Sequence, residues 1–327
     1  MKKNITVLTL CAMLFAFCAS AQAQQTTKIP RIGYLGAASA SANVARVQAF
    51  RQGLREAGYI EGKNIIIEYR FAEEKFDRLP ALVADLVGLK VDVIVSGGSA
   101  VTAPAKEATT TIPIVMTGDD DPVGNGFIAS LARPGGNITG LSTLTGELSG
   151  KRLEILKETV PRLASVAVFG SSTGQTSAQS LRETELAAGA FGVKLQYLDV
   201  QGPKDVETSF RAASKGRADA VLLLASAILV ARRTQVADLA VKARLPTIYY
   251  RPEYVEDGGL MSYATSLTDL SRRASTYVDK ILKGTKPADL PVEQPKKFEF
   301  IINLKAAKQI GLTIPPNVLV RADKVIK

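Results

Sequence analysis

The sequence predicts an α/β protein with two lobes, each built on a parallel sheet, joined by a hinge of several strands. Three observations lead to this prediction. From Arg31 onward, short β-branched apolar runs alternate with amphipathic helical segments, which is typical of βαβ units. The alternation stops at a glycine-rich stretch, residues 133–137, and then starts again. The 327 residues also exceed the roughly 250–300 at which a single hydrophobic core usually stops growing, so two domains are expected.

The first series of elements opens with a buried strand and an amphipathic helix. Residues 32–35 form an apolar run, and Phe50 and Leu54 belong to a helical face that ends at Gly58, a residue type common after helices. The same reasoning predicts a helix over residues 79–87 and strands over residues 65–69, 91–95, 112–116 and 138–142.

The second series repeats this pattern after a helix of alternating charge over residues 150–159. Leu270, Ala274 and Val278 share one apolar helical face that ends at Gly284. Strands are expected over residues 166–169, 194–200, 220–224, 247–250 and 298–302, with helices between them and a last helix over residues 304–310.

The restart of the pattern predicts where the chain passes from one lobe to the other. Residues 141–146 follow the glycine-rich stretch and are the candidate for the first crossover. Gly258 and Gly259 are one candidate for another, and the lobes are expected to close about residues 141–146 and 262–266. Two lobes joined in this way form a hinge, and the cleft between them is where a ligand is expected.

The N-terminal segment has the three parts of a secretory signal peptide. Lys2 and Lys3 form a basic start, residues 7–18 an apolar core, and residues 21–23 an Ala-Gln-Ala cleavage motif. We therefore expect cleavage near Ala23 and a periplasmic mature protein. Both cysteines fall within this segment after bulky residues, which argues against lipidation. No later stretch has the roughly 20 apolar residues of a transmembrane helix, so the mature protein is not expected to be membrane-embedded.

The composition excludes most catalytic and metal-binding chemistry. The chain has no histidine and no tryptophan, and its two cysteines lie in the expected signal peptide. It therefore lacks the base of a Ser-His-Asp triad, a thiolate nucleophile and the usual ligands of zinc. Carboxylate or lysine chemistry remains, but no motif groups such residues. We expect no catalytic residue and no metal site. The formal net charge of +10 is dispersed, which does not indicate nucleic-acid binding.

A set of ordered motifs spans the mature chain. They are FRQGLREAGYIEGKNIIIEYR (50–70), VDVIVSGG (91–98), TTTIPIV (109–115), DPVGNGFIASLARPGGNITG (121–140), KRLEILKETVP (151–161), GGLMSY (258–263) and the segment from RRASTYVDKIL to AAKQIGL (272–312). In these motifs the chain resembles the ABC-transporter substrate-binding proteins with the type I periplasmic fold, often described as tryptophan/tyrosine-type uptake components.

The resemblance implies two Rossmann-like lobes, no cofactor, a small-molecule ligand, and a permease with its ATPase as partners. A monomer is expected. The resemblance alone implies a third crossover and the return of the C-terminal segment to the second lobe. With these, the expected domains are the signal peptide (1–23), lobe 1 (28–142 and about 265–292) and lobe 2 (143–264 and about 293–327).

Ligand contacts are expected at the carboxyl ends of the strands, where loops lead into helix N-termini. The loop of Gly97, Gly98, Ser99 and Ala100 fits best, because its glycines allow close backbone approach and the Ser99 hydroxyl could hold a carboxylate. Family members commonly have Thr-Pro at the last two positions, so the hydroxyl is kept and the proline is not. The alternative is that Ser99 caps the next helix.

The loop after the next strand holds carboxylates that could pair with a ligand ammonium. The three carboxylates are those of Asp119, Asp120 and Asp121. Asp119 and Asp121 are selected as candidates, and Asp121 matches the Asp-Pro of the family. Asp121 could instead start a turn or cap a helix, and the spacing lacks the pattern of a calcium loop. Gly36 and Ser39 follow the first strand, where no dinucleotide fingerprint is present.

The second lobe offers further candidates at strand ends and near a crossover. Its tyrosines could stack on a planar ligand, although a tyrosine at a strand end more often packs in the core. Family members often have Asn-Pro where this chain has Gly170-Ser171. The candidates are Phe169, Ser171, Ser226, Tyr250 and Tyr263.

We therefore expect an extracytoplasmic solute-binding protein of an ABC importer, which binds an amino acid or related small organic acid between its lobes. The alternative is the ligand-sensing domain of a regulator with the same fold. The predicted signal peptide and the lack of a helix-turn-helix before Arg31 favour the first function. An enzyme is disfavoured by the missing histidine and cysteine.

Overall fold

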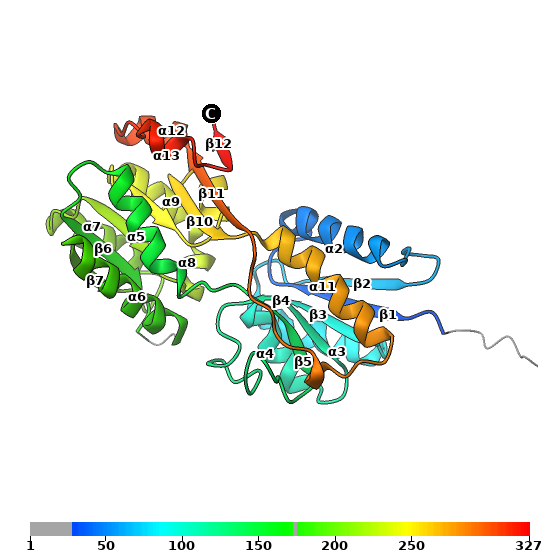
Figure 1. Ribbon diagram of the computed structural model, residues 1–327. Helices are drawn as coiled ribbons and strands as arrows, with labels where there is room; N and C mark the ends of the chain where they lie inside the picture. Colours follow the sequence, from blue (N-terminus) through cyan, green and yellow to red (C-terminus); the bar gives the residue numbers. More distant parts are fainter. Residues whose placement is uncertain (1–27, 173–174) are drawn as a thin grey trace, which may run out of the picture.

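The computed structural model describes residues 28–172 and 175–327 and shows two α/β lobes side by side (Figure 1). Each lobe has its own sheet, one of five strands and one of seven, with helices on both faces. The expected fold class is therefore confirmed. The expected signal peptide, residues 1–23, lies outside the described residues.

The first lobe has strands that pair only in parallel. The strands are β1 (Arg31–Gly36), β2 (Ile66–Phe71), β3 (Val93–Gly97), β4 (Ile114–Asp119) and β5 (Ile138–Ser142), in the order β2-β1-β3-β4-β5. The helices are α2 (Val44–Glu56), α3 (Leu79–Gly88), α4 (Ser99–Ala108) and α11 (Leu267–Leu282), with 3-10 turns η1 (Ser41–Asn43), η2 (Phe76–Arg78) and η3 (Pro287–Asp289). Strand β4 runs beyond its predicted end at residue 116, which draws Asp119 into the sheet.

The second lobe has one antiparallel pair, β10 with β11, among otherwise parallel neighbours. The strands are β6 (Ser165–Gly170), β7 (Lys194–Asp199), β8 (Ala220–Leu223), β9 (Thr247–Tyr249), β10 (Met261–Thr265), β11 (Phe298–Asn303) and β12 (Lys324–Ile326), in the order β12-β11-β10-β9-β8-β6-β7. The helices are α5 (Leu148–Thr159), α6 (Gln175–Phe191), α7 (Asp205–Lys215), α8 (Ala227–Ala231), α9 (Arg233–Lys242), α10 (Glu253–Glu256), α12 (Leu304–Ile310) and α13 (Pro316–Leu319).

Each sheet of the molecule separates two hydrophobic cores. In β1, Ile32 and Tyr34 pack with α2 and α11, whereas Leu35 packs with α3 and α4 on the opposite face. Because both faces are covered, the strands are continuous apolar runs, and this local signal predicts them from sequence. The helices bury one face each, and among those described none combines the length and apolar character needed to span a membrane.

The chain crosses between the lobes at three places in its described part, near residues 143–147, at Ser266, and over residues 290–297 (Figure 1). Glu293 pairs with the end of β5, where its N–H donates to Gly140 O at 3.0 Å and its carbonyl accepts from Ser142 N at 3.0 Å. The crossover expected at Gly258 and Gly259 is wrong. Those glycines lie inside the second lobe, between α10 and β10.

One buried arginine ties two of the crossovers together. Arg152 of α5 is 1% exposed, and its Nε donates to Tyr263 O at 2.8 Å while its Nη1 donates to Thr145 O at 2.9 Å. Thr265 adds a hydroxyl bond to the carbonyl of Thr143. Burial lowers the pKa of Arg152 to about 10, which leaves it charged at neutral pH. The hinge is therefore held by hydrogen bonds between segments far apart in sequence.

Candidate ligand-binding site

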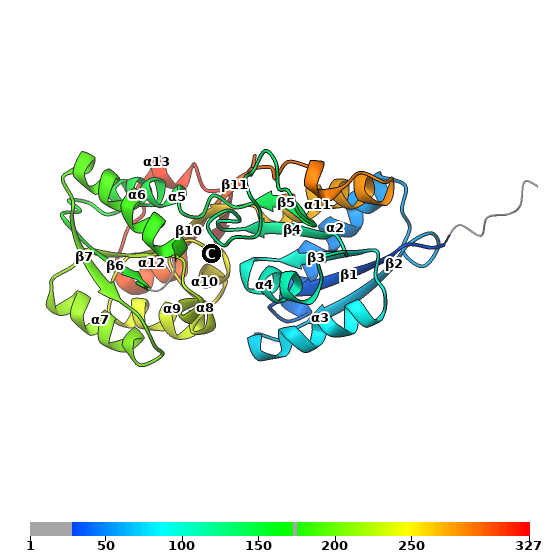
Figure 2. The ribbon, with the colours of Figure 1, turned by 90° about the horizontal axis from the view of Figure 1, so that it is seen from below.

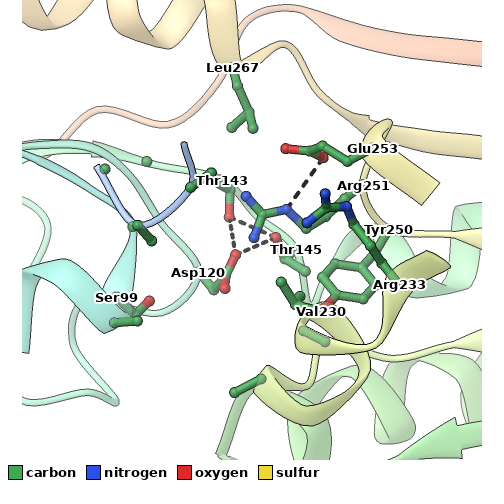
Figure 3. A pocket seen from close by; sticks show the side chains of 18 of the residues that line it. Ser99, Asp120, Thr143, Thr145, Val230, Arg233, Tyr250, Arg251, Glu253 and Leu267 are labelled. Atoms are coloured by element: carbon green, nitrogen blue, oxygen red, sulfur yellow. Dashed lines mark hydrogen bonds and ion pairs between the residues drawn. The ribbon is translucent and has the colours of Figure 1, made fainter. Parts of the chain in front are cut away.

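A cavity of about 510 Å³ lies between the lobes and is lined by residues of both (Figure 3). From the first lobe come the loops after β1, β3 and β4 and the first crossover. From the second come the loops after β8 and β9 and part of α9. The carboxyl ends of the parallel strands of the two sheets thus face one another, as expected for open α/β sheets.

The Asp120 carboxylate is held in the cavity by two hydroxyl groups of the first crossover. The hydroxyls of Thr143 and Thr145 donate to the same oxygen, Oδ1, at 2.9 and 2.7 Å. The two hydroxyls also lie 2.7 Å apart, which fixes their orientation. Figure 3 shows this group on the wall that belongs to the first lobe.

Asp119 lies beneath this wall and is fully buried. Its Oδ1 accepts from Asn125 Nδ2 at 3.0 Å and from Asp121 N at 3.1 Å. Its buried Oδ2 has no hydrogen-bond partner among the described residues. Burial, with a smaller contribution from the charge of Asp120, raises the pKa of Asp119 to about 7. The two neighbouring carboxyl groups are therefore in very different environments.

The loop between β3 and α4 forms another part of the first-lobe wall. Gly98 has φ 101°, a conformation that favours glycine, and is itself the N-cap of α4. Ser99 is the first residue of α4, and α4 has no side-chain cap, so the capping role considered for Ser99 is not observed. Its Oγ accepts from Asn125 Nδ2 at 3.4 Å, at the edge of hydrogen-bonding distance. Ser99 also interacts with the Asp119 carboxyl group, and it borders the cavity (Figure 3).

Arg251 and Glu253 follow β9 on the second-lobe wall. The Nε of Arg251 lies 3.6 Å from Oε2 of Glu253, whose other oxygen contacts Arg46 of α2. Burial alone would raise the pKa of Glu253, but Arg251 and Arg46 hold it at about 2. The Glu253 charge in turn raises the pKa of Arg251. Both side chains are therefore charged under all physiological conditions.

Two ion pairs connect the lobes at the cavity. Arg46 of the first lobe pairs with Glu253 of the second, and Arg233 of the second lobe pairs with Glu74 of the first. Arg233 is also held within its own lobe by Asp257 at 2.9 Å. All of these residues line the cavity, so the ion pairs lie on its walls.

The structure brings together seven of the residues selected from the sequence. Those that line the cavity are Gly97, Gly98, Ser99, Ala100, Ser171, Ser226 and Tyr250. The phenol of Tyr250 donates to Ser226 O at 3.3 Å and accepts from Ser226 N at 3.2 Å, so it fastens the loop after β8. Its ring packs against the ring of Tyr254, and Tyr250 forms part of the cavity wall.

The other selected residues lie outside the cavity lining, each for a local reason. Phe169 is in the second-lobe core, where its ring packs against Phe210. Tyr263 is stacked on Phe298 of the neighbouring strand. Asp119 is buried below the wall, as described above.

In the first lobe, three further selected residues have structural partners instead of a place on the cavity wall. Gly36 packs under the Phe71 ring, and Ser39 accepts from Ala42 N at 3.2 Å in the turn before α2. Asp121 accepts from Gly124 N at 2.8 Å and so starts a turn, which is the alternative considered from the sequence.

Two charged residues of the cavity, Asp120 and Arg251, are absent from the residues selected from the sequence. Asp120 directly follows β4, but no sequence signal shows which of the neighbouring carboxylates faces the cavity. No sequence signal links Arg46 to Glu253, since the two are 207 positions apart. Among the described residues, no cluster of histidine, cysteine, aspartate and glutamate suited to a metal ion is present.

Comparison with known proteins gives one family and several relatives. The pattern of the family described as ABC transporter substrate binding protein matches residues 32–326. A tyrosine-binding protein of Clostridioides difficile is 24% identical over 265 residues, which are 81% of this chain and 76% of that protein.

Two solved structures have a fold similar to that of this chain, with sequence identities of 30% and 25%. A conserved domain protein of Vibrio cholerae is 30% identical, with a TM-score of 0.80, over 91% of this chain and 100% of that one. An ABC domain in complex with L-Trp, from Streptococcus pneumonia, is 25% identical, with a TM-score of 0.77, over 90% of this chain and 100% of that one.

Proposed function

Because this chain belongs to the family of ABC transporter substrate-binding proteins, we propose that its interlobe cavity binds a free amino acid or a related small organic acid. The family binds solutes for ABC importers, and this chain is the solute-binding component of such a system. The observation that carries the choice of ligand is the pair of opposite charges in the cavity. Asp120 lies on one lobe and Arg251 on the other.

The size and apolar lining of the cavity support the same choice. Its volume of about 510 Å³ is within the roughly 300–1,000 Å³ of small-molecule sites. Phe76, Ile228, Val230 and Leu267 supply apolar surface for the ligand's side chain. The relatives include a tyrosine-binding protein and a protein in complex with L-Trp, so aromatic amino acids are the first candidates.

The setting in which the protein works follows from the same family. We propose a periplasmic monomer that releases its ligand to a permease driven by an ATPase, without catalysis and without a cofactor. The regulator alternative has less support, because the family that covers residues 32–326 is one of transporter components.

The test is a binding screen of the mature protein. The standard amino acids and small organic acids are added singly in a thermal-shift assay, and positive compounds are titrated by calorimetry. A ligand present at about 100 times its Kd adds about 2.7 kcal/mol to the free energy of unfolding, which raises Tm by several degrees. If no compound of either class raises Tm of the folded protein, the proposed ligand class is wrong.

Two matched variants locate the site. Ala38→Trp places a large side chain on the cavity wall and is expected to abolish binding. Ala132→Trp puts the same side chain at an exposed position outside this cavity and should leave the affinity unchanged. Equal affinities in both variants would place the ligand elsewhere.

A further inference from the structure

We propose that Asp120 and Arg251 together select a zwitterion, with Asp120 binding the ligand's cationic group and Arg251 its anionic group. The inference rests on the proposed function and narrows it. A free amino acid fits this pair, whereas a simple organic acid or a simple amine satisfies only one of its members.

The hydrogen bonds of Asp120 leave one of its oxygens for a ligand. Both threonine hydroxyls, from Thr143 and Thr145, donate to Oδ1. No hydrogen bond from the described residues reaches Oδ2, and the residue is partly exposed to the cavity. The two donors fix the carboxylate without neutralising it. An ammonium group at Oδ2 would add a charge-assisted hydrogen bond, which is stronger than a neutral one.

Arg251 is held by a carboxylate of its own lobe. Its only ion pair within the described residues is with Glu253, where the closest approach is 3.6 Å from Nε. The side chain is 35% exposed, and Figure 3 shows the guanidinium pointing into the cavity toward Asp120. A guanidinium presents parallel N–H donors in a planar fork that matches a carboxylate. Arg251 is therefore positioned to bind a carboxylate rather than a second protein group.

The charges on the two walls do not cancel by direct contact. Arg46 and Arg251 share the single carboxylate of Glu253, so these three side chains together carry one excess positive charge. Asp120 raises the pKa of Arg251 across the cavity, yet the two form no ion pair in the described part of the chain. Closing the lobes on an apolar or singly charged ligand would remove one of these charges from water without a partner, which is costly. A zwitterion supplies a partner to each.

The experiment compares amino acids with analogues that lack one charge. The probes are L-tryptophan, tryptamine and indole-3-propionate, with the corresponding trios for tyrosine and leucine. Each is titrated by calorimetry into wild type, Asp120→Asn and Arg251→Gln. Wild type is expected to bind at least one amino acid at least about tenfold more tightly than either of its analogues.

The two variants should change selectivity in opposite directions. Asp120→Asn should lose about tenfold or more in affinity for the amino acid but not for the acid analogue. Arg251→Gln should lose a similar factor for the amino acid but not for the amine. A purely structural defect would weaken all three probes together. Asp77→Asn and Arg55→Gln, at exposed positions outside the cavity, are the charge-matched controls and should leave all affinities unchanged.

Three results would overturn the inference. If an acid or amine analogue binds wild type as tightly as its amino acid, the proposed function survives but the selection of a zwitterion fails. The proposed function also survives, and the selection of a zwitterion fails, if an amino acid binds and neither variant changes selectivity. This result is expected if Asp120 and Arg251 simply pair with each other when the lobes close. If wild type binds none of the probes, and no compound of the broader screen, both proposals fail.

Discussion

Asp119 and Asp120 show how one position in a strand changes the role of a side chain. Asp119 ends β4 and is turned into the protein, where it is fully buried. Asp120 is turned to the cavity and receives two threonine hydroxyls. The strand ends between these two residues, so two identical neighbouring side chains lie in different surroundings and have different chemistry.

The buried carboxyl group of Asp119 predicts an unusual dependence of stability on pH. Its pKa is about 7 in the folded protein, above the model-peptide value of 3.8. Between about pH 4 and about pH 7 the folded state therefore binds more protons at this group than the unfolded state. Its contribution to the free energy of unfolding falls as the pH rises through that range, by at most about 1.4 kcal/mol per pH unit, and is constant above it.

Asp119→Asn tests this dependence. The amide keeps an oxygen for Asn125 and Asp121 N and carries no charge, so the stability of the variant relative to wild type should increase from about pH 5 to about pH 8. Urea unfolding of both proteins at several pH values measures the difference. Parallel curves over this range would mean that Asp119 ionises in the folded protein as it does in the unfolded chain.

At the scale of elements, α2 and α11 are in close contact at Gly53. A Cβ atom at this position would lie 2.2 Å from Ser275 Oγ and 2.4 Å from the carbonyl oxygen of Arg272, both of α11. Helix α11 follows the second crossover, so this contact joins segments more than 200 positions apart to complete the first lobe. Glycine at residue 53 therefore permits the close approach of the two helices.

We expect Gly53→Ala to destabilise the protein by about 1–3 kcal/mol or more, because backbone atoms of α11 cannot move aside as a flexible side chain could. Gly88→Ala is the matched control, since nothing lies within 4 Å of a Cβ atom at this exposed helical position. The control should stabilise the protein by about 0.4–1 kcal/mol through the unfolded state. Chemical unfolding measures both. A Gly53→Ala variant as stable as the control would show that the helices can separate freely.

At the scale of the whole molecule, the two lobes contact each other through charges on the cavity walls. The pairs Arg46 with Glu253 and Arg233 with Glu74 join different lobes (Figure 2 shows α2 and α9 on opposite sides of the interface). The side chains are 20–43% exposed, so each pair is expected to stabilise the closed arrangement by less than about 1 kcal/mol. Together they bias the lobes toward closure before a ligand arrives.

The double variant Arg46→Gln/Arg233→Gln should therefore be more open without ligand. A loss of about 1 kcal/mol reduces the ratio of closed to open molecules about fivefold, which weakens ligand binding by up to the same factor. Small-angle scattering should give a larger radius of gyration for the variant. Raising NaCl from about 0.05 M to about 0.5 M should open wild type more than the variant, because salt screens exposed charges.

Arg272→Gln is the control for this prediction. Its ion pair with Glu56 is somewhat more exposed, at 43% and 49%, but joins α11 and α2 within the first lobe. The control should keep the wild-type radius of gyration and salt response. If the double variant behaves like this control, the interlobe ion pairs do not influence closure.

Most of the fold was predictable because its signals are local. The strands β1, β3, β5 and β6 are buried on both faces, so each is an apolar run that stands out over a few residues. Their ends are harder to predict. Strand β4 continues through Thr117, Gly118 and Asp119, polar or small residues whose burial depends on neighbouring segments.

Part of the candidate site could also be predicted from local sequence, because a strand followed by glycines and a helix places its loop at the edge of the sheet. This reasoning selected Gly97, Gly98 and Ser99, which line the cavity. It also selected Phe169, which is buried on the opposite side of its strand. Sequence identifies the end of a strand, but the side chain that faces the ligand depends on how that end is oriented.

The sequence by itself determined the fold class, the helix and strand pattern, the motifs of the family and the absence of histidine chemistry. Only the tertiary structure decided that Asp120 rather than Asp121 faces the cavity, and that Arg251 lies across from it. It also decided that Arg46 meets Glu253 at a separation of 207 positions. The physical reason is that secondary structure follows from side chains a few positions apart, whereas the cavity forms where two lobes meet through three distant crossovers.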